Sequence, residues 1–346
     1  MTRATTIRDV ARSAGVSIAT ASRVLNGSEL VTEATRKRVL QVVDELQFTP
    51  SSSARRLSLG RTMTITVVTW SVTRPQAVER LRGVDAVLSD SEFDLVIYNV
   101  ETVEKRDQDM RTLPLAQRTD GMLLISLPPR PEDIARLASA SVPVVVVDVH
   151  SPTLRGLPRV MGDDVAGGEL AVSHLLGLGH RNVGYIGDAF ENPFGFTSSR
   201  DRFAGYERAL ASAGIAPRPE WIALGAHGRY EARELACRLL SGPDRPTAIF
   251  AASDTQALGV IAAAHEVGLD VPGDLSIVGY DDIEAAEYVG LTTIRQRLFE
   301  SGRLGAQLLL KEIEQRSDVP ISTDLPPDLV IRATSSPVKE EGLPRG

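Results

Sequence analysis

Apolar residues near the N-terminus recur at the spacing of helices that bury one face. Gly15 separates two such sets, at a point where the chain must reverse, and a positive φ is expected there. Thr6 and Ser17 precede the two sets and are N-cap candidates. The pattern therefore predicts two short helices joined by a tight turn. The two sets are Ile7, Val10 and Ala11, followed by Ala21, Val24 and Leu25.

A third helix is predicted to begin after Thr32, which caps it, and to end before Pro50. Three short helices enclose a core of marginal size, so this unit is expected to depend on attachment to the rest of the chain or to a partner. The apolar stripe of the third helix consists of Val39, Val42, Val43 and Leu46, and it extends to Phe48.

Beyond about Thr62, strand-like segments alternate with amphipathic segments. This alternation predicts parallel sheets flanked by helices, and two successive sets of strands predict two similar lobes. Ligands of open parallel sheets bind beyond the carboxyl ends of the strands, so facing lobes would form a cleft there. The predicted strands are residues 64–69, 94–99, 121–126, 144–148, 182–187, 221–225, 248–251 and 275–279. The predicted helices include residues 76–88, 166–178, 200–213, 230–240 and 255–267.

The first turn of the second N-terminal helix, residues 17–20, faces outward together with Ser22 and Arg23, and polar side chains open this helix. This pattern is typical of a helix-turn-helix that lays its second helix in the major groove of DNA. Residues 1–61 hold ten basic and five acidic residues, a net charge of +5; the whole chain carries −7, so the remainder carries −12. A basic unit on an acidic body fits phosphate contacts made by one end of the chain. The alternative is two helices of an ordinary small bundle.

The composition is typical of a soluble globular protein, with 346 residues, 42% hydrophobic and 5% aromatic. No apolar stretch reaches the ~18 residues of a membrane-spanning helix, and Met1 leads into polar residues rather than a signal peptide. Cys237 is the only cysteine, which favours a reducing compartment. The sequence therefore predicts a cytoplasmic protein without membrane contact.

Motifs of enzymes and metal sites are missing from the sequence. The five histidines form no His-Glu-x-x-His pair, one cysteine cannot build a thiolate metal site, and there is no Gly-x-Ser-x-Gly elbow. Residues 177–182 begin like a dinucleotide-binding loop, but they lack the third glycine and precede a predicted strand. We expect no catalytic residues, no cofactor and no metal, with an enzyme on a two-lobed scaffold as the less favoured reading.

The run at residues 6–27 resembles the headpiece of the lactose-repressor/galactose-repressor (LacI/GalR) family of bacterial transcription regulators. The segment Pro-Ser-Ser-Ser-Ala-Arg-Arg-Leu at 50–57 is similar to the hinge helix of that family. Segments at residues 167–181, 202–206, 250–254, 272–282 and 291–296 are similar to its effector domain. The resemblance implies an N-terminal all-α helix-turn-helix headpiece and an α/β, two-lobed, periplasmic-binding-protein-like effector domain.

The domains implied in this way are a helix-turn-helix unit at 1–49, a hinge at 50–61, an effector-binding and dimerisation domain at 62–335, and a tail at 336–346. The chain is expected to cross between the lobes near 161, 291 and 322. The N-lobe would then hold about 62–160 and 292–321, and the C-lobe about 161–291 and 322–335.

The resemblance also implies partners. It indicates a repressor that binds a pseudo-palindromic operator in double-stranded DNA as a homodimer, under the control of a small-molecule effector that is often a sugar in this family. Effector binding would change the angle between the lobes. That change would either free or brace the pair of hinge helices, and both alternatives remain. The alternative is a sugar-binding protein without DNA-dependent regulation.

The family's DNA contacts can be carried onto matching positions. Ile18 and Ala19 match the two positions that vary most with operator sequence, and their apolar side chains favour thymine methyl contacts or shape fit. Leu57 matches a leucine that wedges into the central minor-groove step, and Ala54 matches the small residue that lets two hinges approach; a flexible linker is the alternative. The candidate DNA-binding residues are Thr6, Ser17, Ile18, Ala19, Thr20, Ser22, Arg23, Asn26, Thr32, Thr35, Ser51, Ala54 and Leu57.

Candidate effector contacts stand at or just past the ends of predicted strands, where a carboxylate can accept two hydroxyl hydrogen bonds. Arg202 follows the long loop 188–199 and can donate a planar pair of bonds. In the family, the residues that match Asp148, Arg202 and Asp281 bind the effector. Each acidic residue alone fits a turn or a helix cap equally well. The candidate effector-binding residues are Trp70, Ser71, Arg74, Asp148, Arg202, Ser253, Asp254 and Asp281.

Residues 69–76 depart from the family pattern. Many members carry an Asn-Pro-Phe-Phe run after the first strand, where this chain has Thr-Trp-Ser-Val-Thr-Arg-Pro-Gln. Trp70 could stack on a sugar face, with Arg74 near enough to add a hydrogen bond, or it could pack between the lobes. His227 and Tyr230, in the short segment 225–230, are weaker candidates. The identity of the effector therefore does not carry over from any one family member.

Overall fold

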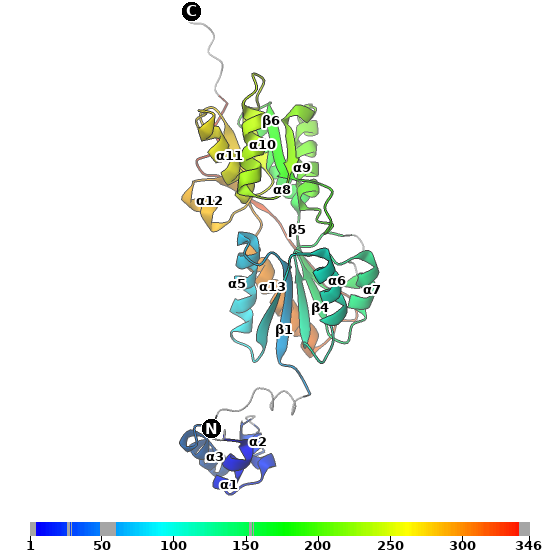
Figure 1. Ribbon diagram of the computed structural model, residues 1–346, viewed down its shortest axis with the longest axis vertical. Coiled ribbons are helices and arrows are strands. Elements are labelled where there is room, and N and C mark those ends of the chain that lie inside the picture. Colours follow the sequence, from blue (N-terminus) through cyan, green and yellow to red (C-terminus); the bar gives the residue numbers. More distant parts are fainter. Residues whose placement is uncertain are drawn as a thin grey trace, which may run out of the picture. The chain divides into compact units, whose positions relative to one another are not determined.

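The computed structural model describes residues 5–25, 28, 30–48, 60–151, 154 and 156–338. The chain divides into two compact units, Met1–Thr62 and Met63–Gly346 (Figure 1). In the described parts of the chain, no helix is both long enough and apolar enough to cross a membrane.

The described residues of the N-terminal unit form helices α1 (Ile7–Ser13), α2 (Ile18–Leu25) and α3 (Glu33–Glu45). This arrangement confirms the three predicted helices. Their apolar faces meet in one small core, made of Val10, Ala14, Val24, Val39 and Val42, with Val16, Val31, Val43, Leu46 and Phe48 packed against it.

The start of α1 and the turn before α2 have the geometry that the sequence predicts. The Asp9 carboxylate accepts hydrogen bonds from the backbone nitrogen of Thr6 at 3.0 Å and from its hydroxyl at 2.7 Å. Gly15 has a φ of 64°, and Ser17 Oγ accepts a hydrogen bond from the Thr20 backbone nitrogen at 3.0 Å. The side-chain cap and the glycine together fix where α1 ends and α2 begins.

In the second unit, the described strands of the first lobe form one six-stranded sheet in which all neighbours pair in parallel. Every side chain of β4, a run of four valines, is buried, as expected for a strand covered on both faces. In order across the sheet, the strands are β11 (Ser322–Leu325), β5 (Arg159–Gly162), β4 (Val144–Val147), β3 (Gly121–Ile125), β1 (Thr64–Trp70) and β2 (Asp94–Val100).

The described strands of the second lobe form another six-stranded sheet, parallel except where β12 runs antiparallel to β10. The eight strands predicted from the sequence are confirmed to within about two residues at each end. In order, the strands are β12 (Asp328–Val330), β10 (Thr292–Arg295), β9 (Ser276–Asp281), β8 (Ala248–Ala251), β6 (Val183–Asp188) and β7 (Ile222–Gly225).

The sheet membership of the connecting strands places the crossovers between the lobes. The first crossover follows β5, which ends at Gly162, close to the predicted position near 161. Because β10 pairs with β9 and β11 pairs with β5, the chain crosses again after Arg295 and after Leu325. These two crossovers lie a few residues beyond the predicted positions near 291 and 322, since each strand completes its pairing before the chain leaves the sheet.

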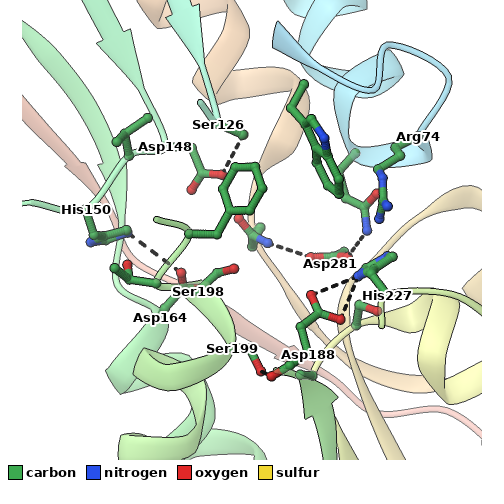
Figure 2. Close-up of a pocket in the computed structure, with 18 of the residues that line it drawn as sticks. Arg74, Ser126, Asp148, His150, Asp164, Asp188, Ser198, Ser199, His227 and Asp281 are labelled. Carbon is green, nitrogen blue, oxygen red and sulfur yellow. Dashed lines mark hydrogen bonds and ion pairs between the residues drawn. The ribbon is translucent and has the colours of Figure 1, made fainter. Parts of the chain in front are cut away.

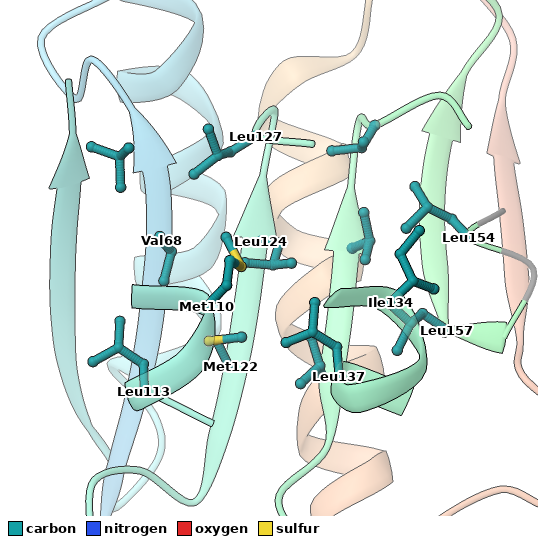
Figure 3. Close-up of a cluster of buried hydrophobic side chains, with 14 residues drawn as sticks. Val68, Met110, Leu113, Met122, Leu124, Leu127, Ile134, Leu137, Leu154 and Leu157 are labelled. Carbon is teal, nitrogen blue, oxygen red and sulfur yellow. The ribbon is translucent and has the colours of Figure 1, made fainter. Parts of the chain in front are cut away.

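Helices cover both faces of the first sheet (Figure 1). Helices α5 (Pro75–Leu88) and α13 (Leu298–Glu314) lie on one face, and α6 (Val103–Thr112) and α7 (Pro131–Ala138) lie on the other. Of these, α6, α7 and α13 lie outside the amphipathic segments that the sequence predicts. Figure 3 shows the layer under α6 and α7, where the buried residues include Val68, Met110, Leu113, Met122, Leu124, Ile134 and Leu137.

The second lobe repeats this three-layer plan. Helices α8 (Asp164–Gly177) and α9 (Ser198–Ser212) cover one face of its sheet, and α10 (Arg229–Leu240) and α11 (Asp254–Glu266) cover the other. The short helix α12 (Glu284–Tyr288) follows β9. The carboxyl ends of the strands and the first turns of several helices therefore meet at one edge of each lobe.

Candidate functional site

A cavity of about 140 Å³ lies where the two lobes meet, at the carboxyl ends of the strands (Figure 2). An engineered protein cavity of roughly 150 Å³ binds benzene, so this space suits a single six-membered ring. Of the predicted effector contacts, Trp70, Arg74, Asp148, Arg202, Ser253 and Asp281 line the cavity.

On the first lobe, Asp148 directly follows β4 and forms an ion pair inside the wall of the cavity. Arg80 Nη2 on α5 donates to Asp148 Oδ2 at 2.5 Å, and Ser126 Oγ donates to the same oxygen at 2.9 Å. Burial acts to raise the pKa of Asp148, but the charges of Arg80, His150 and Arg202 outweigh it, and the pKa is lowered. Asp148 is therefore a fixed negative charge that its own lobe already partners.

On the second lobe, Arg202 lies in the first turns of α9 and is almost fully buried. Its Nε donates to Asp164 Oδ1 at 2.8 Å, and its Nη1 donates to the carbonyl oxygen of Ala252 at 2.5 Å. The guanidinium carbon lies 3.8 Å from the centre of the Tyr280 ring. Burial acts to lower the pKa of Arg202, but Asp164 and Asp281 raise it well above the usual value.

Asp281 ends β9 and connects the second lobe to the first. Gln76 of α5 donates to its Oδ2, Gln296 Nε2 donates to its Oδ1 at 2.5 Å, and Arg202 Nη1 lies 3.7 Å from Oδ1. Arg80 Nη2 also donates to Gln296 Oε1 at 2.9 Å. Burial raises the pKa of Asp281 in spite of these partners. A continuous polar chain thus joins the carboxylate of one lobe to the ion pair of the other.

Two glycines allow the close helix crossings that position the arginines. A Cβ at Gly302 of α13 would overlap the carbonyl oxygen of Arg80, and a Cβ at Gly168 of α8 would overlap the carbonyl oxygen of Arg202. Both arginines therefore sit at points where only a glycine on the neighbouring helix fits.

Trp70, at the end of β1, packs against aromatic residues of the second lobe. Its ring centre lies 4.8 Å from that of Phe196 and 6.1 Å from that of Phe194, both in the loop between β6 and α9. The guanidinium carbon of Arg74 lies 3.9 Å from the centre of the Trp70 ring. Of the two interpretations of Trp70 given above, these contacts favour packing between the lobes over stacking on a ligand.

Two predicted effector contacts do not line the cavity. Asp254, the first residue of α11, is fully buried, and its carboxylate accepts hydrogen bonds from the Thr293 hydroxyl and, at 2.9 Å, from the Ile283 backbone nitrogen. Burial and the charge of Asp281 raise the pKa of Asp254 well above its usual value. Ser71 lies in the turn after β1 with a φ of 49°. Their neighbours Ser253 and Trp70 face the cavity in their place.

The cavity also brings in residues that sequence reasoning missed. Asp188 ends β6, accepts a hydrogen bond from Gln256 Nε2 at 2.9 Å, and lies 3.0 Å from His227 Nδ1. Its position at the end of a predicted strand could have identified it from the sequence. His227, a weaker candidate, lines the cavity, whereas Tyr230 is exposed. Ser126 ends a predicted strand and Gln296 ends a segment similar to the family's effector domain, so both carried a signal as well. No signal in the sequence indicated the other cavity-lining residues named above, which are Gln76, Arg80, His150, Asp164 and Phe196.

Three buried polar atoms at the cavity have no hydrogen-bond partner among the described residues. They are Thr69 Oγ1, Arg80 Nε and His150 Nε2, the last of which lies 3.8 Å from Asp164 Oδ2. A buried polar atom without a partner costs ~1–3 kcal/mol, so a polar ligand that bonds to these atoms would gain free energy at this wall. Among the described residues, no cluster of histidine, cysteine or acidic side chains is suited to hold a metal ion.

In the N-terminal unit, the predicted groove-facing side chains lie on the outer face of α2. Ser17, Ile18, Ala19 and Arg23 are exposed, and Thr20 and Ser22 are half-buried, while Ala21 and Val24 enter the core. An exposed isoleucine in the first turn of a short helix contributes little to the core that the described residues form, and its contact to DNA stays a prediction.

The remaining candidate DNA contacts divide into two groups. Thr6 is half-buried at the start of α1, and the hydroxyls of Thr32 and Thr35 lie 3.0 Å apart at the start of α3. The others lie outside the described residues, namely Asn26, Ser51, Ala54 and Leu57.

Comparison with known proteins joins the two units in one family. Residues 6–51 match the model of bacterial regulatory proteins of the lacI family, and residues 172–335 match a periplasmic binding protein-like domain. The chain is 36% identical to the ribose operon repressor of Haemophilus influenzae over 331 residues, which cover 94% of this chain and 97% of that protein. The chain belongs to the lacI family.

Solved structures of lacI-family relatives support the same family assignment. The Lac repressor dimer bound to operator and the anti-inducer ONPF is 29% identical with a TM-score of 0.85, over 96% of this chain and all of that one. The transcriptional regulator CelR in complex with cellobiose is 29% identical with a TM-score of 0.70, over 95% of this chain and 99% of that one. This lacI-family protein is a DNA-binding transcriptional repressor with a small-molecule effector site.

Proposed function

We propose that this lacI-family repressor binds a pseudo-palindromic operator as a homodimer and that a sugar or sugar derivative in the cavity between the lobes controls it. Relatives support the class of ligand, since one is named for a ribose operon and another is solved with cellobiose. The Lac repressor relative is solved as a dimer on its operator. As a regulator of transcription, the protein would act in the cytoplasm, and no catalytic role is proposed.

The observation that carries the proposal is the polar chain that spans the cavity. Asp148 belongs to one lobe and Asp281 to the other, and Arg80 and Gln296 connect them. A ligand that bonds to either carboxylate competes with these internal bonds and so changes how the lobes hold each other. Coupling of ~1–3 kcal/mol between the two sites is enough for a regulator.

At the DNA end, the exposed face of α2 supports reading of the major groove, with Ile18 and Ala19 toward the base edges and Arg23 on the same exposed face. Two copies of such a unit would read the two halves of a symmetric site, because the symmetry of a dimer is repeated in its operator.

The proposal is tested by selecting binding sites from a random pool of duplex DNA with the purified full chain at moderate salt. The expected result is a two-fold symmetric site with a flexible central step. The selection is repeated with a small-molecule extract of bacterial cells, because a co-repressor would be needed in some regulators. If no sequence is enriched in either condition, the result would contradict the repressor function and favour a solute-binding protein.

A further inference from the structure

Arg74 is a cation at the cavity wall that no acidic side chain among the described residues neutralises. It caps α5 and belongs to the segment in which the sequence departs from the family pattern. Its guanidinium stacks on Trp70, and none of the described residues forms an ion pair or a hydrogen bond with that group. Burial lowers the pKa of Arg74, and the charge of Asp188 offsets only part of this effect. The group has therefore lost water without gaining a counter-ion from the described part of the chain.

The four carboxylates that line the cavity are in the opposite situation, because side chains of the protein itself engage each of them. Arg80 and Arg202 offset part of this negative charge as partners of Asp148, Asp164 and Asp281, so an incoming anion would not face four free carboxylates. The partners are Arg80 and Ser126 for Asp148, Arg202 for Asp164, Gln256 and His227 for Asp188, and Gln76 and Gln296 for Asp281.

The polar groups of the cavity wall that have no partner among the described residues are mainly hydrogen-bond donors. Arg80 Nε can only donate, and the Thr69 hydroxyl can donate; both are buried without partners among the described residues. The first turns of α5 and α9 and the cap of α11 also reach the cavity, through Gln76, Ser198 and Ser253. Helix N-termini carry partial positive charge and favour bound anions.

We infer that the effector is a single-ring compound with an anionic group, a carboxylate or a phosphate, and that Arg74 binds this group through paired hydrogen bonds. The planar guanidinium matches the two oxygens of either group. The cavity volume suits a neutral part of about one ring. Figure 2 shows Arg74 across the cavity from Asp148 and His150, so a ring can lie between the anionic end and the polar groups of the first lobe. This inference rests on the proposed function, because it names the ligand class of the same site.

The test separates a small-molecule extract of bacterial cells by anion exchange at neutral pH into a retained anionic fraction and an unretained fraction. The Tm of the full chain is measured with each fraction. We expect the retained fraction alone to raise Tm, since a ligand that binds only the folded state stabilises it. Phosphatase treatment of that fraction distinguishes the two anionic groups. The increase in Tm is lost if the ligand is a phosphate ester and kept if it is a carboxylate.

Two variants make the test specific to Arg74. In Arg74→Gln the retained fraction should lose its effect on Tm. The matched control is Arg82→Gln, on the same helix but exposed and paired with Glu79 outside the cavity, and it should respond as the parent does. The Tm of each variant without ligand shows that it is folded.

Affinities for defined probes complete the test. Glucuronate, glucose 6-phosphate and neutral glucose are titrated calorimetrically into the parent and into Arg74→Gln. A charged probe that binds should bind ~10- to 100-fold more weakly to the variant, while any binding of glucose should be unchanged.

The outcomes separate the two proposals. Stabilisation by the unretained fraction, or an equal response of Arg74→Gln to the retained fraction, would overturn the anionic effector and leave the proposed function standing. No stabilisation by either fraction would overturn the small-molecule control itself, and the anionic effector with it.

Discussion

At the scale of single residues, Arg202 and Asp281 show how burial sets the chemistry of the cavity. Arg202 is held by Asp164, by the Ala252 carbonyl and by the face of Tyr280, and its pKa is raised by its carboxylate neighbours against the effect of burial. Removing one member of such a group leaves the other charges buried without a partner, which costs more than the pair itself contributes.

Arg202→Ala should therefore lower the free energy of unfolding by ~3–5 kcal/mol as well as abolish the response to an effector. Denaturant unfolding of the full chain measures the first effect. Arg200→Ala is the matched control, because Arg200 is two residues away on the same helix but exposed, and it should change stability by less than ~0.5 kcal/mol. Equal losses in the two variants would contradict the role assigned to burial.

His180 is a buried titratable residue away from the cavity. Its ring lies 2.9 Å from Thr247 Oγ1, 3.0 Å from Ser276 Oγ and 3.0 Å from the carbonyl oxygen of Ser336, so it fastens the C-terminal segment to the second lobe. Burial lowers its pKa, and the bond to the Ser336 carbonyl offsets part of this shift.

Because the folded state lowers the pKa of His180, folding favours the neutral ring. This contribution to stability is complete above the unfolded pKa of about 6.5 and is lost as the pH falls through the folded value. The free energy of unfolding should thus fall as the pH drops below about 6.5, and His180→Asn should show a shallower fall. A slope in His180→Asn equal to that of the parent would refute the assignment.

At the scale of elements, the close crossings of α5 with α13 and of α8 with α9 position Arg80 and Arg202, two of the three arginines that line the cavity. Gly302 and Gly168 make these crossings possible, and each touches the backbone of an arginine rather than its side chain. The position of each guanidinium is therefore set by helix packing that lies outside the cavity.

Gly302→Ala should destabilise the chain by ~1–3 kcal/mol, because the added methyl group must push α13 away from α5. Gly177→Ala offers the opposite case. Gly177 is an exposed helical glycine, and apart from its chain neighbours and the backbone of its own helix no described atom lies within 4 Å of the point where its methyl group would be added. Alanine there should stabilise by ~0.5–1 kcal/mol. Unfolding midpoints of the two variants decide the matter, and a stabilised Gly302→Ala would contradict the close crossing.

The sequence predicted the elements better than the contacts between them. Strands such as β4 are uniformly apolar and helix starts carry caps such as Ser17, so local pattern was enough to locate them. Arg80 and Gln296 were not predictable, because they lie 216 residues apart and meet only after the chain has crossed between the lobes. For the same reason the sequence indicated strand-end residues such as Asp148 but not the donors that engage them.

At the scale of the whole molecule, the two units of the chain carry opposite charges. Residues 1–61 carry +5 and the rest carries −12, so the body repels DNA while the N-terminal unit attracts it. Approach to the operator is thereby restricted to one unit, and control by a cavity in the other requires a connection through the segment around residues 50–57.

Leu57→Ala tests that connection. If Leu57 wedges into the central step of the operator, its loss should weaken operator binding by about tenfold or more and leave the affinity for effector unchanged. Fluorescence anisotropy with the selected operator measures the first quantity and calorimetry the second. Operator affinity equal to that of the parent would rule out the wedge.

The place of Gln296 has a practical consequence. This amide stands at the crossover that follows β10 and contacts both Arg80 and Asp281, whereas Arg74, the proposed ligand contact, belongs to a separate segment after β1. Recognition of a compound and transmission of its presence are therefore encoded in different stretches of sequence. A biosensor for a new analyte is thus best engineered by diversifying residues 71–74 while Trp70 and the relay through Gln296 are left untouched.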